Sequence, residues 1–160
     1  MTFKLDLEQA KKRAMELLTS GYHWGPSILQ VLWETAGMED EDYLWAGIPF
    51  IGGIAGHQDA PCGAISASTV FIGLNNRCSS TEKEKAKSGR EKARTEATEF
   101  VRDFKKEFED INCLELVGYD FTDKAAAEKA KEAGEGMANC PKYIEFALEK
   151  IYEFEKIEDE

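Results

Sequence analysis

The amino-acid sequence predicts an all-α protein that folds as a single compact domain over residues 1–160, around a buried central helix. Apolar residues recur at three- and four-residue steps along nearly the whole chain, which is the spacing of an amphipathic helix. Valine and isoleucine between Cys62 and Leu74 leave a strand as an alternative there, but no alternation of apolar and polar residues supports one. A chain of 160 residues, 42% of them hydrophobic, is long enough to bury a substantial core. No internal repeat or long linker divides the chain, and an acidic tail is expected at about 155–160.

Each predicted helix rests on an apolar stripe and on residues that mark its ends. Pro26 suits the first turn of the second helix, and Gly37 follows its last turn. The segment from Cys62 to Leu74 contains no charged residue, so we expect it to form the buried central helix. Ser80 or Thr81 is expected to cap the long charged helix that follows, whose early part should be exposed or frayed. In chain order the predicted helices cover about 7–18, with Gly21 as a stop signal, 26–36, 39–51, 62–74, 81–108, 125–133 and 139–151, and a short turn covers 112–117.

Charge and hydropathy exclude several classes of protein. The formal net charge is −11, from 31 acidic and 20 basic residues, so we expect no nucleic-acid partner because phosphate binding needs a basic surface. Prolines and polar residues interrupt the most apolar tract, from Tyr43 to Leu74, below the ~20 residues that a membrane-spanning helix needs. The first residues lack the apolar block of a secretory signal. We therefore expect a cytoplasmic protein, not an integral membrane protein, whose four cysteines are thiols.

Three cysteines share a local context that has chemical consequences. Cys62, Cys113 and Cys140 are each predicted in the first turn of a helix. The free N–H groups and the positive end of the helix dipole favour a negative group there, so the pKa of such a thiol can be lowered. A thiolate is both a nucleophile and a metal ligand. The expected N-cap residues are Asp59 or Ala60, Asn112 and Asn139.

Structural explanations compete with these chemical ones. Each cysteine could instead be a small buried residue in a tightly packed core, because no close metal-binding spacing is present. His57, in the turn before Cys62, is a candidate ligand or proton donor, or else a polar turn residue. Cys78 lies in a polar loop and is interpreted as an incidental exposed thiol, and His23 is interpreted as structural. The glycine-rich segment from Gly52 to Gly56 indicates a tight turn or a close approach of two backbones.

Three segments of the chain together resemble a known family. The family is that of putative redox-active proteins defined by a CGAxxG motif and four motif cysteines, and the resemblance covers most of the chain from about Tyr22 onward. Two positions depart from the family pattern. Trp24, or Gly25, stands where the first motif cysteine is expected, and Ala67 replaces the final glycine of the motif. The matching segments are GGIAGHQDAPCGAISA (52–67), NCLELVGYD (112–120) and NCPKYIEFA (139–147).

The resemblance implies a redox-active or metal-binding protein and no particular substrate. Our leading hypothesis is a redox-active or metal-thiolate protein in which Cys62, Cys113 and Cys140 converge as catalytic thiols or metal ligands, with an unknown electron or thiol partner. A thiol- or metal-dependent oxidoreductase is the candidate enzyme class. Cys62 is the expected principal nucleophile, and His57 is a candidate fourth metal ligand. Cys78 could replace the missing motif cysteine in space. Thiolate ligands would favour zinc, an iron–sulfur centre or another thiophilic metal. The candidate cofactor-binding glycines are Gly53, Gly56 and Gly63.

A second hypothesis is a binding module or dimeric structural module that has lost the ancestral cysteine site. Trp24 in place of a cysteine favours this alternative, and Tyr22, Trp24 and Trp45 could then line an apolar pocket or a dimer surface. A homodimer is the default expectation for a small helical protein and has no specific support in this sequence.

Overall fold

The structure is a computed structural model that describes residues 3–20, 24–133 and 136–156. Within these ranges the chain is helical, apart from one isolated antiparallel bridge between Pro61 and Asn112, and the expected all-α class is confirmed. Gly21, Tyr22, His23, Gly134 and most of the expected acidic tail lie outside the described residues. The helices are α1 (Leu7–Thr19), α2 (Trp24–Thr35), α3 (Asp42–Gly47), η1 (Ile48–Phe50), α4 (Gly63–Asn75), α5 (Lys83–Phe108), α6 (Cys113–Val117), α7 (Lys124–Glu132), η2 (Gly136–Asn139) and α8 (Cys140–Lys156).

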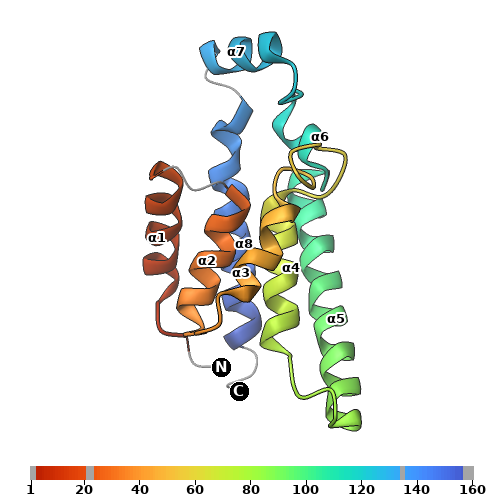
Figure 1. Ribbon diagram of the computed structural model, residues 1–160. Coiled ribbons are helices and arrows are strands. Elements are labelled where there is room, and N and C mark those ends of the chain that lie inside the picture. Colours follow the sequence, from red (N-terminus) through yellow and green to blue (C-terminus); the bar gives the residue numbers. More distant parts are fainter. Residues whose placement is uncertain (1–2, 21–23, 134–135, 157–160) are drawn as a thin grey trace.

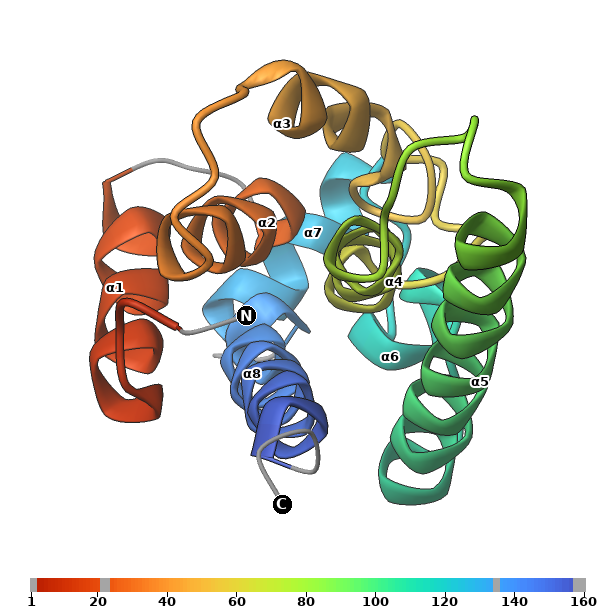
Figure 2. The ribbon, with the colours of Figure 1, turned by 90° about the horizontal axis from the view of Figure 1, so that it is seen from below.

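The C-terminal helix α8 lies between two pairs of helices. Figures 1 and 2 show α1 and α2 on one side of it and α4 and α5 on the other. α8 contacts all four of these helices, and α2 makes its most extensive contact with α4. The main core lies between them because each helix turns its apolar stripe inward. Its largest fully buried apolar side chains are Phe71, Phe100, Phe104, Ile28, Leu32, Ile144, Leu148 and Val31.

The central buried helix that the sequence predicts is α4. It packs between α2 and α5 and also contacts α8. Small residues such as Ala64, Ala67 and Ser68 let the neighbouring helices approach it closely. The absence of charge between Cys62 and Leu74 therefore reflects contacts on several sides of the helix. Its buried residues are Gly63, Ala64, Ile65, Ala67, Ser68, Phe71 and Ile72.

The expected cap of α5 is wrong. The N-cap is Glu82, not Ser80 or Thr81, and its side chain makes no capping hydrogen bond. The hydroxyl of Thr81 lies 2.7 Å from that of Ser79, so it is engaged in the preceding turn. The first turns of α5 are mostly exposed, as expected, but they are regular helix and not frayed.

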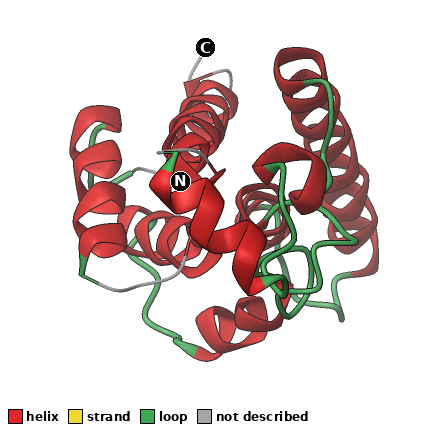
Figure 3. Cartoon of the chain, turned by 90° about the horizontal axis from the view of Figure 1, so that it is seen from above, coloured by secondary structure: helices red, strands yellow, loops and turns green. Residues whose placement is uncertain are grey.

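Three helices begin at the same end of the bundle. α4, α6 and α8 start near the top of Figure 1, where α7 crosses above them. Figure 3 views this end from above, and the Pro61–Asn112 bridge joins the segments that lead into α4 and α6. The segment from 112 to 117, expected to be a turn, is a short helix that ends at Gly118, whose φ is +83°. None of the described helices is both long and apolar enough to cross a membrane.

Candidate functional site

A short left-handed turn shapes the loop that carries Cys62. The five residues from Gly52 to Gly56 all have φ between 52° and 80°. Gly53 is the most tightly enclosed of them, because a Cβ atom there would lie 2.5 Å from the Cα of Gln58 and 2.9 Å from the carbonyl oxygen of Ala60. The glycine-rich segment is thus a tight turn and also a close approach of two backbones, as the sequence indicated.

The bridge after this turn places Cys62 beside Cys113. The N–H of Cys62 donates to the carbonyl of Ile111 at 2.8 Å, and the N–H of Cys113 donates to the carbonyl of Ala60 at 3.0 Å. Successive side chains point to opposite faces of an extended backbone. Cys62 and Cys113, which directly follow the bridged residues Pro61 and Asn112, therefore project from the same face. Two helices that begin 50 residues apart in sequence (residues 63 and 113) therefore start next to each other.

A buried glutamine holds a third segment against this pair. Gln58 is 1% exposed and has a φ of +63°. Its side-chain amide donates to the carbonyl of Tyr119 at 2.9 Å, and its side-chain oxygen accepts from the N–H of Phe121 at 2.6 Å. Its own carbonyl accepts from the N–H of Leu114 at 3.2 Å. Sequence reasoning missed Gln58, because a glutamine in a polar turn gives no sign that it will be buried.

The three helix starts surround one cavity of about 590 Å³. Cys62, Cys113 and Cys140 all line it, so the structure brings together the three cysteines that the sequence singled out. They are free thiols and all three are buried. The other described lining residues are mostly apolar: Ile48, Ile51, Gly52, Ala55, Gly56, Gly63, Val117, Tyr119, Phe121 and Ala127.

Burial dominates the electrostatics of these thiols. It raises the pKa of Cys113 to about 11, an effect that the charge of Cys62 reinforces and a hydrogen bond from Gln58 opposes. Burial also raises the pKa of Cys140 to about 12, reinforced by the charges of Cys62 and Cys113. Because the three cysteines line one cavity, a charge on one of them disfavours ionisation of the others. All three are therefore neutral near neutral pH.

The expected lowering of the thiol pKa at the helix starts is wrong in its net direction. For Cys62, burial raises the pKa, while the backbone N–H groups of Ala64 and Ile65 at the start of α4 lower it by less. The helix terminus acts as expected, but desolvation of the thiolate outweighs it.

The position of Cys62 also differs slightly from the expectation. α4 begins at Gly63, and Cys62 is its N-cap with extended backbone (φ −51°, ψ 144°), so neither Asp59 nor Ala60 caps the helix. The bridge explains the shift, because Pro61 must remain extended to pair with Asn112. Cys113 and Cys140 are the first residues of α6 and α8, as predicted.

Two of the three candidate cofactor glycines reach the cavity. Gly56 and Gly63 are among its lining residues, whereas Gly53 is buried against the backbone of Gln58 and is not. His57 is exposed and is also not among the lining residues. In the part of the chain that the structure describes, no group of three or more His, Cys, Asp or Glu side chains is arranged to hold a metal ion.

Cys78 lies far from the other sulfurs. It is exposed and follows the C-terminal end of α4, whereas Cys62 precedes the N-terminal end of the same helix. A helix of 13 residues is about 20 Å long, so Cys78 cannot replace a missing thiol at the cavity. Trp45, one of the aromatic residues of the second hypothesis, is not among the described residues that line the cavity. Trp45 is 69% exposed, and Tyr22 and the side chain of Trp24 lie outside the described residues.

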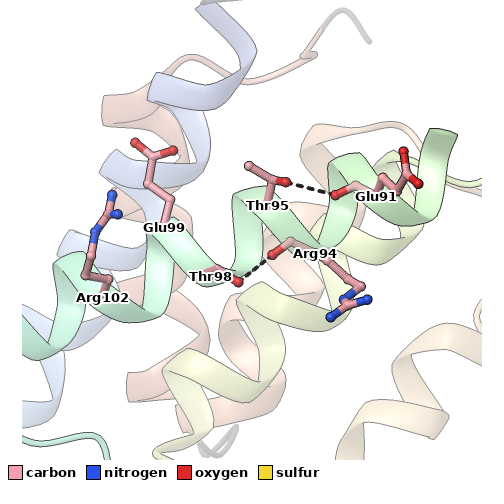
Figure 4. Close-up of a pocket in the computed structure, with 6 residues that line it drawn as sticks. All are labelled: Glu91, Arg94, Thr95, Thr98, Glu99 and Arg102. Carbon is pink, nitrogen blue, oxygen red and sulfur yellow. Dashed lines mark hydrogen bonds between the residues drawn. The ribbon is translucent and has the colours of Figure 1, made fainter.

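A second hollow, of about 420 Å³, lies on the outer face of α5 (Figure 4). All its lining residues come from this one helix. The hydroxyls of Thr95 and Thr98 donate to the carbonyls one turn earlier, at Glu91 and Arg94, so they are already engaged within the helix. Its described side chains all come from one helix face, and they form no ligand-binding arrangement. Its lining residues are Glu91, Arg94, Thr95, Thr98, Glu99 and Arg102.

Comparison with known families agrees with this geometry. Residues 22–154 match the model of the family described as "Putative redox-active protein (C_GCAxxG_C_C)". The chain belongs to this family. No curated protein and no solved structure matches the chain. The matched residues include Cys62, Cys113 and Cys140, the three cysteines that line the cavity.

Proposed function

We propose that this protein is a thiol oxidoreductase that exchanges a dithiol for a disulfide at the cavity. The observation that carries the proposal is that Cys62, Cys113 and Cys140 line one cavity, with Cys62 and Cys113 joined through a backbone bridge. Membership of a family with a redox description supports the same class of chemistry. Free cysteines of this kind suit a reducing compartment, so we place the activity in the cytoplasm.

The reaction balances with a disulfide as the oxidising partner. The thiolate of Cys62 attacks one sulfur of the disulfide R–S–S–R′, forms a mixed disulfide and releases the first thiol. The thiolate of Cys113 then attacks Cys62, forms the Cys62–Cys113 disulfide and releases the second thiol. Two protein thiols are oxidised, one substrate disulfide is reduced, and the two thiol protons pass to the two leaving thiolates.

The backbone donors at Cys62 support its role as the attacking thiol. The N–H groups of Ala64 and Ile65, at the start of α4, lower the pKa of Cys62 against the larger effect of burial. Cys113 is the resolving thiol in this proposal, because the bridge holds its helix start beside that of Cys62. Cys140 is a third, neutral thiol at the same wall of the cavity.

The proposal uses thiol exchange and not a metal–thiolate centre, because no group of three or more His, Cys, Asp or Glu side chains among the described residues is arranged to hold a metal ion. Elemental analysis of purified protein keeps this choice open to test. Stoichiometric zinc or iron, lost on substitution of Cys62, would overturn the thiol-exchange proposal in favour of a metal centre.

Dipyridyl disulfide tests the exchange directly, because each attack releases one coloured thiopyridone. In a Cys78→Ser background we expect two equivalents of thiopyridone, a mass loss of two hydrogens, and a Cys62–Cys113 crosslink in the peptide map. Added Cys113→Ser should leave a stable mixed disulfide on Cys62 and release one equivalent. Added Cys62→Ser should remove the reaction.

The matched control is Cys140→Ser, which should still release two equivalents. Circular dichroism checks that each variant is folded. Mixed disulfides on separate cysteines with no Cys62–Cys113 crosslink, or an undiminished reaction after Cys62→Ser, would overturn the proposal.

A further inference from the structure

The chemistry of the cavity wall restricts what can occupy it. None of the described lining residues carries a formal charge. The described polar side chains in the wall are the three thiols and the phenol of Tyr119. A charged ligand placed there would lose water and gain no side-chain partner of opposite charge from these residues, which is costly. The helix starts do not offset this cost, because at Cys62 burial already outweighs the backbone N–H groups that favour a negative charge.

The thiols add no charge of their own near neutral pH. Burial raises the pKa of Cys113 to about 11 and that of Cys140 to about 12, so neither offers an anion to pair with a cationic ligand. The formal net charge of −11 on the whole chain further disfavours the approach of an anion.

The apolar wall continues to the surface of the molecule. Ile48 lines the cavity and is also 38% exposed. Phe50 and Ile54, close to Ile48 along the chain, are 43% and 45% exposed, and Trp45 precedes it by three residues. On the other side, the rings of Tyr119 and Phe121 meet edge to face at 5.5 Å, held in place by Gln58. An apolar cavity whose wall reaches the surface, as it does at Ile48, is typical of a site for an apolar molecule.

We infer that the cavity binds an uncharged, apolar small molecule, and that the disulfide substrate of the proposed function belongs to this class. The volume of about 590 Å³ falls within the range of small-molecule sites. This inference rests on the proposed function for the substrate's reactive bond, but the selectivity for uncharged apolar ligands rests on the wall alone. Disulfides that carry carboxylates are poor substrates in this scheme.

Two aromatic disulfides that differ in charge test the selectivity. Dipyridyl disulfide is uncharged, whereas dithiobis(nitrobenzoate) carries two carboxylates. We compare their rates on the Cys78→Ser protein at neutral pH with their rates on the same protein unfolded in guanidinium chloride, where every thiol is accessible. The ratio of the uncharged to the charged reagent should be about tenfold or more higher in the folded protein, because one buried unpaired charge costs at least that much. Equal ratios would overturn the inference.

Binding without chemistry is a second, independent readout. The uncharged fluorescent probe N-phenyl naphthylamine should bind the protein, and Ala127→Phe should weaken its binding at least about tenfold, because Ala127 lines the cavity. Ala125→Phe is the matched control, because Ala125 is exposed on the same helix α7. This variant should bind the probe as tightly as the unsubstituted protein. Equal probe binding by the two variants would also overturn the inference.

The two proposals fail separately. If the probe binds and Ala127→Phe weakens that binding, but no Cys62–Cys113 disulfide forms, the apolar ligand site stands and the redox function falls. If the disulfide forms but both reagents react in the unfolded-state ratio, the redox function stands and the apolar selectivity falls.

Discussion

At the scale of single residues, the loop before α4 depends on positions whose importance comes from the backbone. Gln58 makes its contacts through both ends of its amide group and through its own carbonyl. Gly53 leaves the space that Gln58 and Ala60 fill. The cavity wall around Tyr119 is therefore fixed by residues that themselves do not line it.

Gly53→Ala and Gly56→Ala form a matched pair that tests this dependence. Both residues have a positive φ, so alanine should cost about 1–2 kcal/mol of stability at either position from backbone strain alone. At Gly53 the new Cβ would also lie 2.5 Å from the Cα of Gln58, whereas at Gly56 it would meet nothing within 4 Å. Gly53→Ala should therefore be the more destabilising by at least about 2 kcal/mol in urea unfolding. Equal losses would mean that the loop relaxes around the added methyl group.

At the scale of elements, the helices followed from periodicity and the loops did not. The apolar stripes around Ala10, Ile28 and Phe104 predicted α1, α2 and α5, because the buried residues of an amphipathic helix recur at three- and four-residue steps. The cap of α5 and the start of α4 were missed, since both depend on contacts of the preceding loop: the hydroxyl pair at Ser79 and the bridge at Pro61. Such loop contacts leave no repeating pattern of apolar residues in the sequence, so periodicity cannot predict them.

Two glycine-to-alanine substitutions, one in α5 and one in α4, should change the stability of the protein in opposite directions. Gly89 of α5 approaches the carbonyl of Asn76, and an added Cβ would lie 2.6 Å from that oxygen. Gly89→Ala should therefore destabilise the protein. Gly73 of α4 is a helical glycine with open space around it, so Gly73→Ala should stabilise the protein by about 0.5–1 kcal/mol. Thermal unfolding of both variants measures the difference, and two shifts of the same sign would contradict the packing described here.

At the scale of the whole molecule, the site depends on three helix starts coming together. The sequence pointed to Cys62, Cys113 and Cys140 through their caps and through the family resemblance, but their convergence depends on how α4, α6 and α8 pack. The direction of the pKa shifts could not be predicted for the same reason. A helix terminus is visible in the sequence, whereas the depth at which it is buried is a property of the complete fold.

The buried thiols make the stability of the fold sensitive to alkali. Their folded-state pKa values are raised above the ordinary 9.0, to about 11 for Cys113 and about 12 for Cys140. Stability is therefore constant in this respect below pH 9.0 and is lost as the pH rises from there towards 11–12, because the unfolded chain releases these protons first. Cys140→Ser should make urea unfolding less dependent on pH in that window, whereas Cys78→Ser, at an exposed thiol, should not. A pH dependence that is the same in all three proteins would contradict this assignment.

The pairing of the segments that lead into α4 and α6 has a topological consequence. A covalent bond between Cys62 and Cys113 would close a ring of polypeptide that contains all of α4 and α5, the helices that supply Phe71, Phe100 and Phe104 to the core. Closing so long a ring removes freedom from the unfolded chain, so oxidation would make the fold harder to dismantle. The free energy of unfolding would then depend on the redox state of the surroundings.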